Sequence, residues 1–297
     1  MTSMNESRAA DSLREKKTAV DRELERLLGD GPGSRLFEAM RYAVLSGGKR
    51  FRPLLLLVSG EAFGGDAGTL LPYACAVELI HNYSLIHDDL PCMDDDDTRR
   101  GRPSCHKAFG EGPALLVGDG LLSLAFEVLV GAPAAAAGSG RKERAVLEIV
   151  RAAGVRGMIG GQWLDIGYAG SAATEASYDD LISKKTGALI LAAVKAGAVL
   201  GGADAAGLSA MEEFGRNVGM AFQLRDDILD SGKEAEGGGA RTRPNSVALF
   251  GTVGAEERLE RAVGRAVAAL DGAGMRSEEL RYLAYGLLIL DEGGGHE

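Results

Sequence analysis

Aromatic residues are scarce in this 297-residue chain, and no sustained alternation of apolar and polar residues runs through it. Phe, Trp and Tyr make up 5% of the residues, although 45% are hydrophobic and 43 are glycine. Strands favour aromatic and β-branched residues, so this composition disfavours a β-sandwich and favours closely packed helices. We see no fixed repeat, and no linker divides the chain, so we expect a single domain over residues 1–297.

Cysteine and positive charge are also in short supply. Cys75, Cys92 and Cys105 are odd in number, and their spacing fits neither a zinc site nor a disulfide framework, so we expect reduced thiols. Lys and Arg total 33 against 43 Asp and Glu, which gives a net charge of −10. A nucleic-acid partner requires a basic footprint, so this charge argues against one.

A signal peptide and a membrane span are not expected either. Residues 1–26 are polar and charged and lack the apolar core of a signal peptide. The apolar runs are too short to cross a bilayer. We therefore expect a cytoplasmic protein with no stable membrane insertion.

Helical periodicity dominates the chain and predicts an all-α protein. The expected helices cover residues 13–28, 36–45, 52–63, 70–89, 114–130, 141–158, 178–200, 209–230, 255–270 and 278–290. Two Gly-rich segments, 132–140 and 231–244, read as connectors. The second follows an acidic motif, which also makes it a candidate lid.

The first acidic motif is Asp88-Asp89-Leu90-Pro91-Cys92-Met93-Asp94-Asp95-Asp96-Asp97. Six carboxylates in ten residues repel one another unless divalent cations lie among them. A solvated acidic loop is the simpler alternative, but this run follows a very apolar helix. Pro91 ends or kinks that helix, so Asp94 can fold back toward Asp88.

The second acidic motif is Asp226-Asp227-Ile228-Leu229-Asp230. On a helix, Asp226 and Asp230 share a face and Asp227 lies beside them. Carboxylates on an otherwise apolar helix are costly unless they are paired or bind metal. Clustered oxygen ligands suit Mg²⁺ shared with substrate phosphates. Zinc is disfavoured, because His81, His87, His106 and His296 form no short ligand pattern.

Basic residues flank these motifs. Lys49 and Arg52 follow two glycines at a helix start, an arrangement that suits a phosphate. Arg99 and Arg100 either balance charge or clamp two different diphosphates. Lys185 and Thr186 precede an apolar helix and could hold phosphate oxygens. His81 lies two helical turns before Asp88 on the same face, where a plain core histidine is the alternative reading.

Together these motifs resemble the trans-isoprenyl diphosphate synthases, in particular the bacterial short-chain farnesyl diphosphate synthases. The matching segments are GGKRFRP at 47–53, VELIHNYSLIHDDLPCMDDDDTRRGRPSCHKAFGE at 77–111, GGQWLDI at 160–166, KKTGALI at 184–190 and FQLRDDILD at 222–230. The resemblance implies an isoprenoid-synthase fold, an antiparallel helix bundle around a central active-site cavity. It also implies a homodimer, Mg²⁺ as cofactor (three ions per site, with Mn²⁺ as a substitute) and two diphosphate substrates.

The resemblance also implies residue roles. The metal ligands would be Asp88, Asp94, Asp226 and Asp230, with Asp89 and Asp227 supporting catalysis together with Arg99 and Lys185. Isopentenyl diphosphate would bind Lys49, Arg52, His81 and Arg100, and the allylic diphosphate would bind Arg99, Lys185, Thr186 and Gln223. Gln162 and Asp165 would line the cavity beside it.

The implied reaction is a head-to-tail condensation of isopentenyl diphosphate with dimethylallyl or geranyl diphosphate. The allylic C–O bond ionises, the isopentenyl double bond attacks the cation, and a proton is lost. Tyr83, with Ser84 beside it, lies five residues before Asp88, where the family uses a bulky aromatic to stop growth near fifteen carbons. Farnesyl diphosphate is the expected product. Geranylgeranyl or geranyl diphosphate is the alternative if Tyr83 is only a core residue.

The chain departs from the family pattern after Asp230. The 231–244 loop looks shorter, Arg243 could replace a family lysine, and no aspartate matches there; the C-terminus is acidic rather than basic. A class I terpene cyclase is a rival reading, but the second Asp-rich motif and the second set of cations argue against it. A low-activity regulatory subunit of a heteromeric synthase is the other rival, although such a subunit should have lost the motifs kept here.

Overall fold

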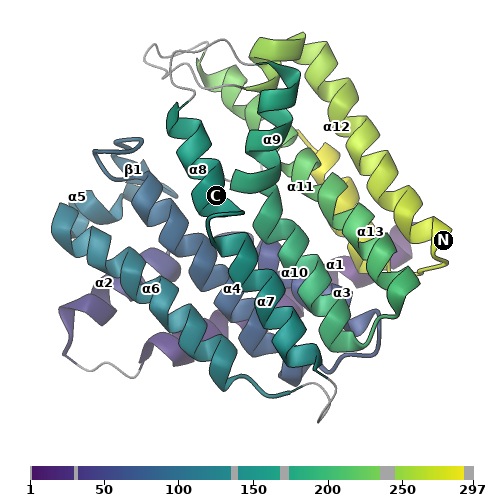
Figure 1. The fold of residues 1–297 in the computed structure, drawn as a ribbon, viewed down its shortest axis with the longest axis horizontal. Helices are drawn as coiled ribbons and strands as arrows, with labels where there is room; N and C mark the ends of the chain where they lie inside the picture. Colours follow the sequence, from purple (N-terminus) through teal and green to yellow (C-terminus); the bar gives the residue numbers. More distant parts are fainter. Residues whose placement is uncertain (1, 30–32, 135–139, 168–173, 235–244, 291–297) are drawn as a thin grey trace.

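A computed structural model describes residues 2–29, 33–134, 140–167, 174–234 and 245–290, and it is helical nearly throughout (Figure 1). The helices are α1 (Thr2–Gly29), α2 (Arg35–Val44), α3 (Phe51–Glu61), α4 (Ala67–Asp88), α5 (Cys105–Phe109), α6 (Glu111–Gly131), α7 (Arg141–Ala153), α8 (Met158–Gly167), α9 (Glu175–Lys185), α10 (Gly187–Gly201), α11 (Ala205–Glu234), α12 (Ser246–Gly272), α13 (Glu278–Tyr285) and the 3₁₀ turn η1 (Gly286–Leu288). The all-α prediction is confirmed.

The longer helices share a common direction and pack side by side around α4 and α10 (Figure 1). Both central helices are apolar on nearly every side and almost fully buried, as expected of helices enclosed in a core. Helix α4 packs against α3 and α6, and α10 packs against α3, α7 and α11. These two helices therefore form a rigid frame for the residues at their ends.

Small residues allow this close packing. A Cβ atom added at Gly197 on α10 would lie 2.2 Å from the carbonyl oxygen of Leu56 on α3, and one at Gly60 would meet Leu70 at 2.5 Å. The backbones of α3 and α10 therefore approach more closely than any larger side chain would allow. This bears out the prediction drawn from the abundance of glycine.

Two predicted helices are each broken in two. The helix expected over 141–158 ends at Ala153, because Gly154 takes an extended conformation, and α8 starts afresh at Met158. The helix expected over 178–200 is interrupted at Thr186, between α9 and α10. At that break α8 passes so close that a Cβ added at Gly161 would lie 2.3 Å from the backbone nitrogen of Lys185. Helical periodicity continues across both breaks, which is why the sequence alone missed them.

A small hairpin was not predicted. β1 (Thr98–Arg99) pairs antiparallel with β2 (Arg102–Pro103). Arg100 and Gly101 form its two-residue turn with φ values of 54° and 71°. Positive φ at both central positions is the geometry that suits a tight hairpin. The short helix α5 follows it directly.

Helix α6 is long and apolar enough to cross a membrane by length and composition, with a mean hydropathy of 1.8. This differs from the expectation that every apolar run is too short. One stripe of α6, with Ala114, Val117, Leu121, Ala125 and Leu129, is buried, and the helix packs against α4. Its other side carries Asp119, Glu127 and exposed leucines.

Candidate active site

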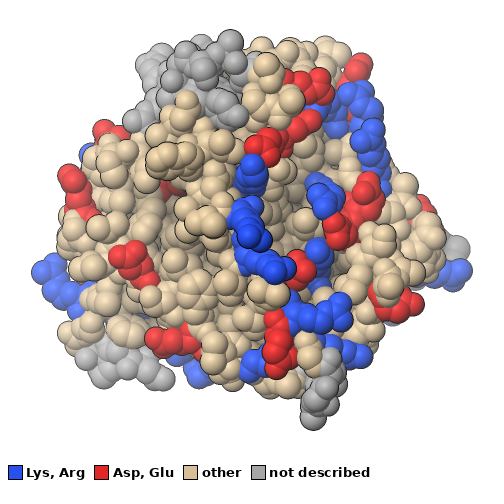
Figure 2. Space-filling model, in the orientation of Figure 1, with Lys and Arg blue, Asp and Glu red and all other residues tan. Residues whose placement is uncertain are grey.

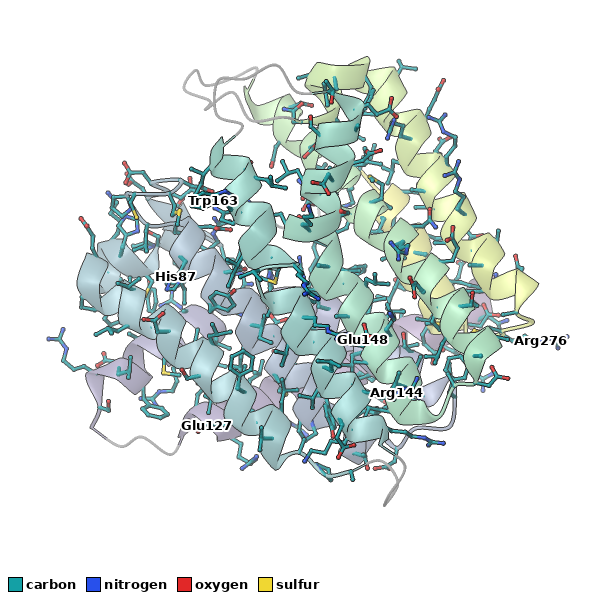
Figure 3. All side chains as sticks on the ribbon, in the orientation of Figure 1. His87, Glu127, Arg144, Glu148, Trp163 and Arg276 are labelled. Carbon is teal, nitrogen blue, oxygen red and sulfur yellow. The ribbon has the colours of Figure 1, made fainter. Side chains whose placement is uncertain are left out.

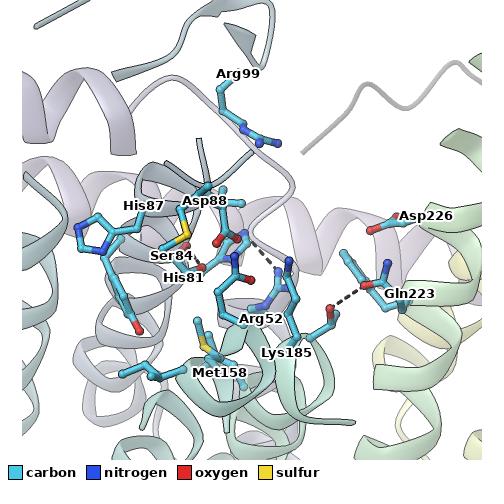
Figure 4. A pocket seen from close by; sticks show the side chains of 18 of the residues that line it. Arg52, His81, Ser84, His87, Asp88, Arg99, Met158, Lys185, Gln223 and Asp226 are labelled. Carbon is cyan, nitrogen blue, oxygen red and sulfur yellow. Dashed lines mark hydrogen bonds between the residues drawn. The ribbon is translucent and has the colours of Figure 1, made fainter. Parts of the chain in front are cut away.

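A cavity of about 800 Å³ lies among α4, α8, α10 and α11, with α6 along one side (Figure 4). It gathers residues from all five segments that the sequence singled out. Those of the candidate residues that line it are Lys49, Arg52, His81, Tyr83, Ser84, Asp88, Arg99, Arg100, Gln162, Lys185, Thr186, Gln223, Asp226 and Asp230. Asp89, Asp94, Asp165 and Asp227 lie beside it without lining it, and Arg243 falls outside the described residues.

The α4 wall presents His81, Ser84 and Asp88 at helical spacing, so all three face the cavity. Nη1 of Arg52 lies 3.3 Å from Nε2 of His81 (Figure 4). Burial, aided by the nearby Arg52 and Arg100, holds the pKa of His81 well below its usual range. His81 is therefore neutral, and because arginine can only donate, Nε2 accepts and Nδ1 carries the proton.

The first acidic motif folds back on itself, as we predicted from the position of Pro91. Helix α4 ends at Asp88, and the backbone N–H of Asp94 donates to the carbonyl of Asp88 at 2.9 Å. The neighbouring Asp89 is buried instead and accepts a 2.5 Å hydrogen bond from Nη2 of Arg99. Burial still raises the pKa of Asp89 above its ordinary value, with Arg99 opposing the rise.

The hairpin directs Arg99, on β1, and Arg100, in the turn, to different partners. Arg99 pairs with Asp89 and, at 3.1 Å, with Asp96. Nη1 of Arg100 donates to the carbonyl of Gly47 at 2.6 Å. A Cβ at Gly48 would lie 3.1 Å from the Arg100 guanidinium, so a glycine there leaves room for it. The hairpin and the Gly47–Gly48 loop thus brace each other at the cavity.

Buried charges fix the loop that carries Lys49. Arg50 has a left-handed φ of 54° and is 3% exposed. Its guanidinium pairs with Asp21 and Glu78, each at 2.8 Å, and donates to the carbonyl of Val44. This anchor joins α1, α3 and α4, and it holds Lys49 and Arg52 on either side of it against the cavity.

In the second acidic motif Asp226 and Asp230 share a face, as their helical spacing predicted, but Asp227 does not join them at the cavity. Asp226 and Asp230, one turn apart on α11, line the cavity, and Figure 4 shows Asp226 on the side opposite Asp88. Asp227 is 8% exposed and turns away. It accepts hydrogen bonds from the Tyr178 hydroxyl (2.6 Å), Gln223 Nε2 (2.8 Å) and the Ser246 N–H (2.6 Å). Burial raises its pKa above the ordinary value, and the hydrogen bonds oppose that rise.

A chain of polar contacts runs from Asp227 to the cavity. Because Gln223 donates to Asp227, its amide oxygen is free to accept from Thr186 Oγ1 at 2.6 Å. Beside Thr186, Nζ of Lys185 pairs with Asp165 at 2.6 Å. The break between α9 and α10 therefore places an ammonium and a hydroxyl in the cavity that Asp226 also lines.

The side of the cavity away from the charges is apolar. Tyr83 packs edge-on against His87, with ring centroids 5.8 Å apart, and burial raises the pKa of Tyr83 to about 12, so it stays protonated. Leu122, Met158 and Leu189 line the same cavity. The cavity therefore joins a charged end to an apolar end.

Sequence reasoning missed several lining residues. Arg225 is 8% exposed, lines the cavity beside Asp226, and donates from Nε to the carbonyl of Ile289. Its position next to the second motif was the available signal. Trp163 and Ile159 on α8 and Asp119 on α6 also line the cavity, and Trp163, labelled in Figure 3, is 79% exposed. The placement of Trp163 and Ile159 depends on the helix break before α8, which the sequence did not reveal.

The donor set suits magnesium and phosphate. Asp88, Asp226 and Asp230 offer only carboxylate oxygens to the cavity, which are the ligands that Mg²⁺ prefers. Lys49, Arg52, Arg99, Arg100 and Lys185 surround them with enough positive charge for more than one diphosphate. The arrangement fits a metal-bound anionic head group attached to an apolar tail.

Comparison with known proteins identifies the family. The profile of the polyprenyl synthetase family matches residues 34–242. Farnesyl diphosphate synthase from Geobacillus stearothermophilus is 41% identical over 274 residues, which is 90% of this chain and 91% of that protein. Large subunit 2 of the heterodimeric geranylgeranyl pyrophosphate synthase of Arabidopsis thaliana is 44% identical over 224 residues, 74% of this chain and 59% of that protein.

The fold agrees with these sequence matches. The apo crystal structure of an FPP/GFPP synthase from Zymomonas mobilis superposes with a TM-score of 0.85 at 34% identity, covering 96% of this chain and 100% of that one. The family is metal-dependent, in keeping with the carboxylates of the cavity. The chain therefore belongs to the polyprenyl synthetase family and is a short-chain prenyltransferase.

Proposed function

We propose that this enzyme condenses isopentenyl diphosphate with dimethylallyl or geranyl diphosphate and stops at farnesyl diphosphate. The observation that carries the proposal is one cavity with carboxylates on two facing walls, cations between them and an apolar end at Tyr83. A cavity of this kind suits two diphosphate head groups and one growing hydrocarbon chain. The relatives named farnesyl diphosphate synthase support the product assignment.

We assign the metal to Asp88, Asp94, Asp226 and Asp230, with Mg²⁺ as the ion, three ions per site, and Mn²⁺ as a substitute. Bound there, Mg²⁺ would supply Lewis acidity that stabilises charge on the leaving diphosphate. Asp89 and Asp227 support this set from behind, one through Arg99 and the other through Gln223.

The cations divide between the two substrates in this proposal. Lys49, Arg52 and Arg100 hold isopentenyl diphosphate, and neutral His81 donates from Nδ1. Arg99, Lys185, Thr186 and Gln223 hold the allylic diphosphate, with Arg243 as a further candidate. Their charge neutralises the leaving group as the allylic C–O bond ionises, and the double bond of isopentenyl diphosphate then attacks the cation.

The apolar walls act after ionisation. Leu122, Met158 and Leu189 keep water from the allylic cation, which would otherwise be quenched to an alcohol. The proton lost in the last step passes to the released diphosphate. Tyr83 lies about 7.5 Å along α4 from Asp88, with Ser84 beside it, and ends the space available to the chain.

Product analysis tests the proposal. Purified enzyme with Mg²⁺ and isopentenyl diphosphate receives dimethylallyl, geranyl or farnesyl diphosphate, and mass spectrometry identifies the products. We expect fifteen carbons from the first two primers, little from the third, and nothing without metal. Tyr83→Ala should lengthen the product to twenty carbons or more, while Tyr83→Phe, the matched control, should not.

Two results would contradict the proposal in different ways. A twenty-carbon product from the native enzyme would keep the mechanism and remove Tyr83 as the floor, which would favour the geranylgeranyl synthase alternative; a ten-carbon product would favour a geranyl synthase. No condensation with any primer would favour a regulatory subunit that needs a catalytic partner.

We also propose a single catalytic domain that forms a homodimer. Large apolar side chains are exposed on α6 and α8: Leu115, Leu116, Val130, Ile159 and Trp163. In Figure 2 the half of the molecule that holds α6 and α8 shows fewer charged side chains than the other half. A second copy of the chain would cover this face. Light scattering on purified protein should give twice the chain mass.

A cytoplasmic location without stable membrane insertion completes the proposal. Helix α6 already buries one stripe against α4, and Asp119 and Glu127 interrupt its apolar length. A carboxylate in mid-bilayer is costly, so a lipid-spanning role for α6 is disfavoured.

A further inference from the structure

A second group of potential metal ligands lies outside the cavity. One ligand atom each from Asp95, Asp97 and His106 lies within 4.8 Å of the other two. None of the three lines the cavity or belongs to the carboxylates assigned to Mg²⁺. The two aspartates are exposed and the histidine is buried.

The hairpin brings these residues together. Asp97 precedes β1, and Ser104 follows β2. The N–H of Ser104 donates to the carbonyl of Asp97 at 2.9 Å, which closes the open end of the hairpin. His106, two residues further on, starts α5 beside that closure. Asp95 is held from the other side, with a left-handed φ of 56° and its N–H bonded to the carbonyl of Leu90.

The hydrogen bonding of the His106 imidazole indicates that this side chain binds a ligand. It is 6% exposed, and Nδ1 lies 3.0 Å from the Ser104 hydroxyl. Within the described part of the chain, Nε2 is buried and has no hydrogen-bond partner. Burying a polar nitrogen without a hydrogen-bond partner is unfavourable, so the native chain gains if a ligand occupies that nitrogen. If Nδ1–H donates to Ser104, Nε2 presents a lone pair, and metal-bound histidines are commonly oriented by such a bond.

We propose that Asp95, Asp97 and His106 form a binding site for Zn²⁺ or a similar transition-metal ion, separate from the magnesium site. One imidazole with two carboxylates is a donor set of the zinc type, with water completing the coordination, whereas Mg²⁺ favours oxygen alone. Histidine spacing could not reveal this site, because its partners are aspartates across a hairpin.

The ion would fasten the base of the hairpin that carries Arg99 and Arg100. It ties the segment before β1 to the segment after β2 and leaves the turn at the cavity. The nearest competitor is Lys107, whose Nζ pairs with Asp97 at 2.7 Å. Both of these side chains are largely exposed, so the ammonium can move aside. Asp96 points elsewhere, to Arg99.

Calorimetric titration of untagged full-length enzyme with ZnCl₂ in excess Mg²⁺ tests the site. We expect one tightly bound Zn²⁺ per chain. His106→Gln should weaken Zn²⁺ binding at least about tenfold. Asp97→Asn should also weaken Zn²⁺ binding, and because Asp97 is exposed, this substitution does not endanger folding. Lys107→Ala should tighten it. Asp226→Asn, the matched control in the magnesium site, should bind Zn²⁺ as the native enzyme does.

Cobalt provides a second measurement. Co²⁺ bound in this site should show the visible absorption bands that are typical of Co²⁺ with few ligands. These bands should disappear in His106→Gln. Native-like Zn²⁺ affinity in both His106→Gln and Asp97→Asn would overturn the proposal. Loss of binding in Asp226→Asn, or displacement of the ion by Mg²⁺, would also overturn it, because the ion would then belong to the catalytic carboxylates.

Discussion

The two aspartate motifs face each other across the cavity, and their neighbouring residues are stabilised in different ways. In the first motif Asp88 ends α4 and faces the cavity, while Asp89 is buried against the positive charge of Arg99. In the second, Asp226 faces the cavity from mid-helix, while Asp227 is buried among neutral donors from α9, α11 and α12.

The difference separates two tasks within each pair. The outward carboxylate faces the cavity, where we propose that metal and substrate bind. The inward one ties that stretch of chain to other elements, by an ion pair in one case and by hydrogen bonds in the other. A buried carboxylate that is hydrogen-bonded only to neutral groups is the more demanding of the two, since nothing neutralises its charge. Substitutions in the second motif should therefore distinguish effects on activity, at Asp226, from effects on stability, at Asp227, more clearly than substitutions in the first motif.

The largest expected effect is on the outward carboxylate. Asp226→Asn removes a negative charge, and with it a proposed metal ligand, from the cavity and keeps the side-chain shape. We expect kcat to fall about 100- to 1,000-fold, comparable to the loss of one charge-stabilising group in an active site. The unfolding free energy should stay close to native. Steady-state kinetics and urea unfolding measure the two, and a stability loss as large as that of Asp227→Asn would break the comparison.

Asp227→Asn should show the opposite pattern. An amide cannot accept all three hydrogen bonds, because when its oxygen accepts from Tyr178 and Ser246, its NH₂ faces the NH₂ donor of Gln223. We expect a loss of about 2–3 kcal/mol in unfolding free energy, with a smaller loss of activity through Gln223. Tyr178→Phe removes one donor only and should lose about 1 kcal/mol. Native stability in Asp227→Asn would show that the network contributes little.

The smallest effect is the pH dependence of that stability. Burial raises the pKa of Asp227 in the folded chain above the ordinary 3.8, so the folded state holds the proton more tightly than the unfolded state. Its contribution is complete below 3.8 and is lost as the pH rises through the folded pKa. The stability advantage of the native enzyme over Asp227→Asn should therefore be larger near pH 4 than near pH 7. A stability advantage of the native enzyme over Asp227→Asn that grows with pH would contradict this prediction.

Much of the site followed from local sequence rules. Pro91 accounts for the return of Asp94 to Asp88, and helical spacing accounts for the shared face of Asp226 and Asp230. These inferences worked because they depend on a few consecutive residues. The confirmed fold rests on the same kind of evidence, the helical period of the apolar residues.

The remainder depended on contacts between distant segments. That Asp227 is buried follows from Tyr178 and Ser246, which lie far from it in sequence. The break at Thr186 follows from the close passage of Gly161, and the burial of Asp89 follows from a hairpin that helical periodicity does not predict. Arg225 was missed for a similar reason, since its bond to Ile289 exists only in the folded chain.

The most direct test of this division is the binding of inorganic diphosphate in the presence of Mg²⁺, measured by calorimetry on the native enzyme, Asp226→Asn and Asp227→Asn. The account predicts that Asp226→Asn weakens binding at least about tenfold, or 1.4 kcal/mol, while Asp227→Asn stays within a few-fold of native. Native-like binding by Asp226→Asn, or its loss in a folded Asp227→Asn, would contradict the assignment of the metal and diphosphate to the outward carboxylates.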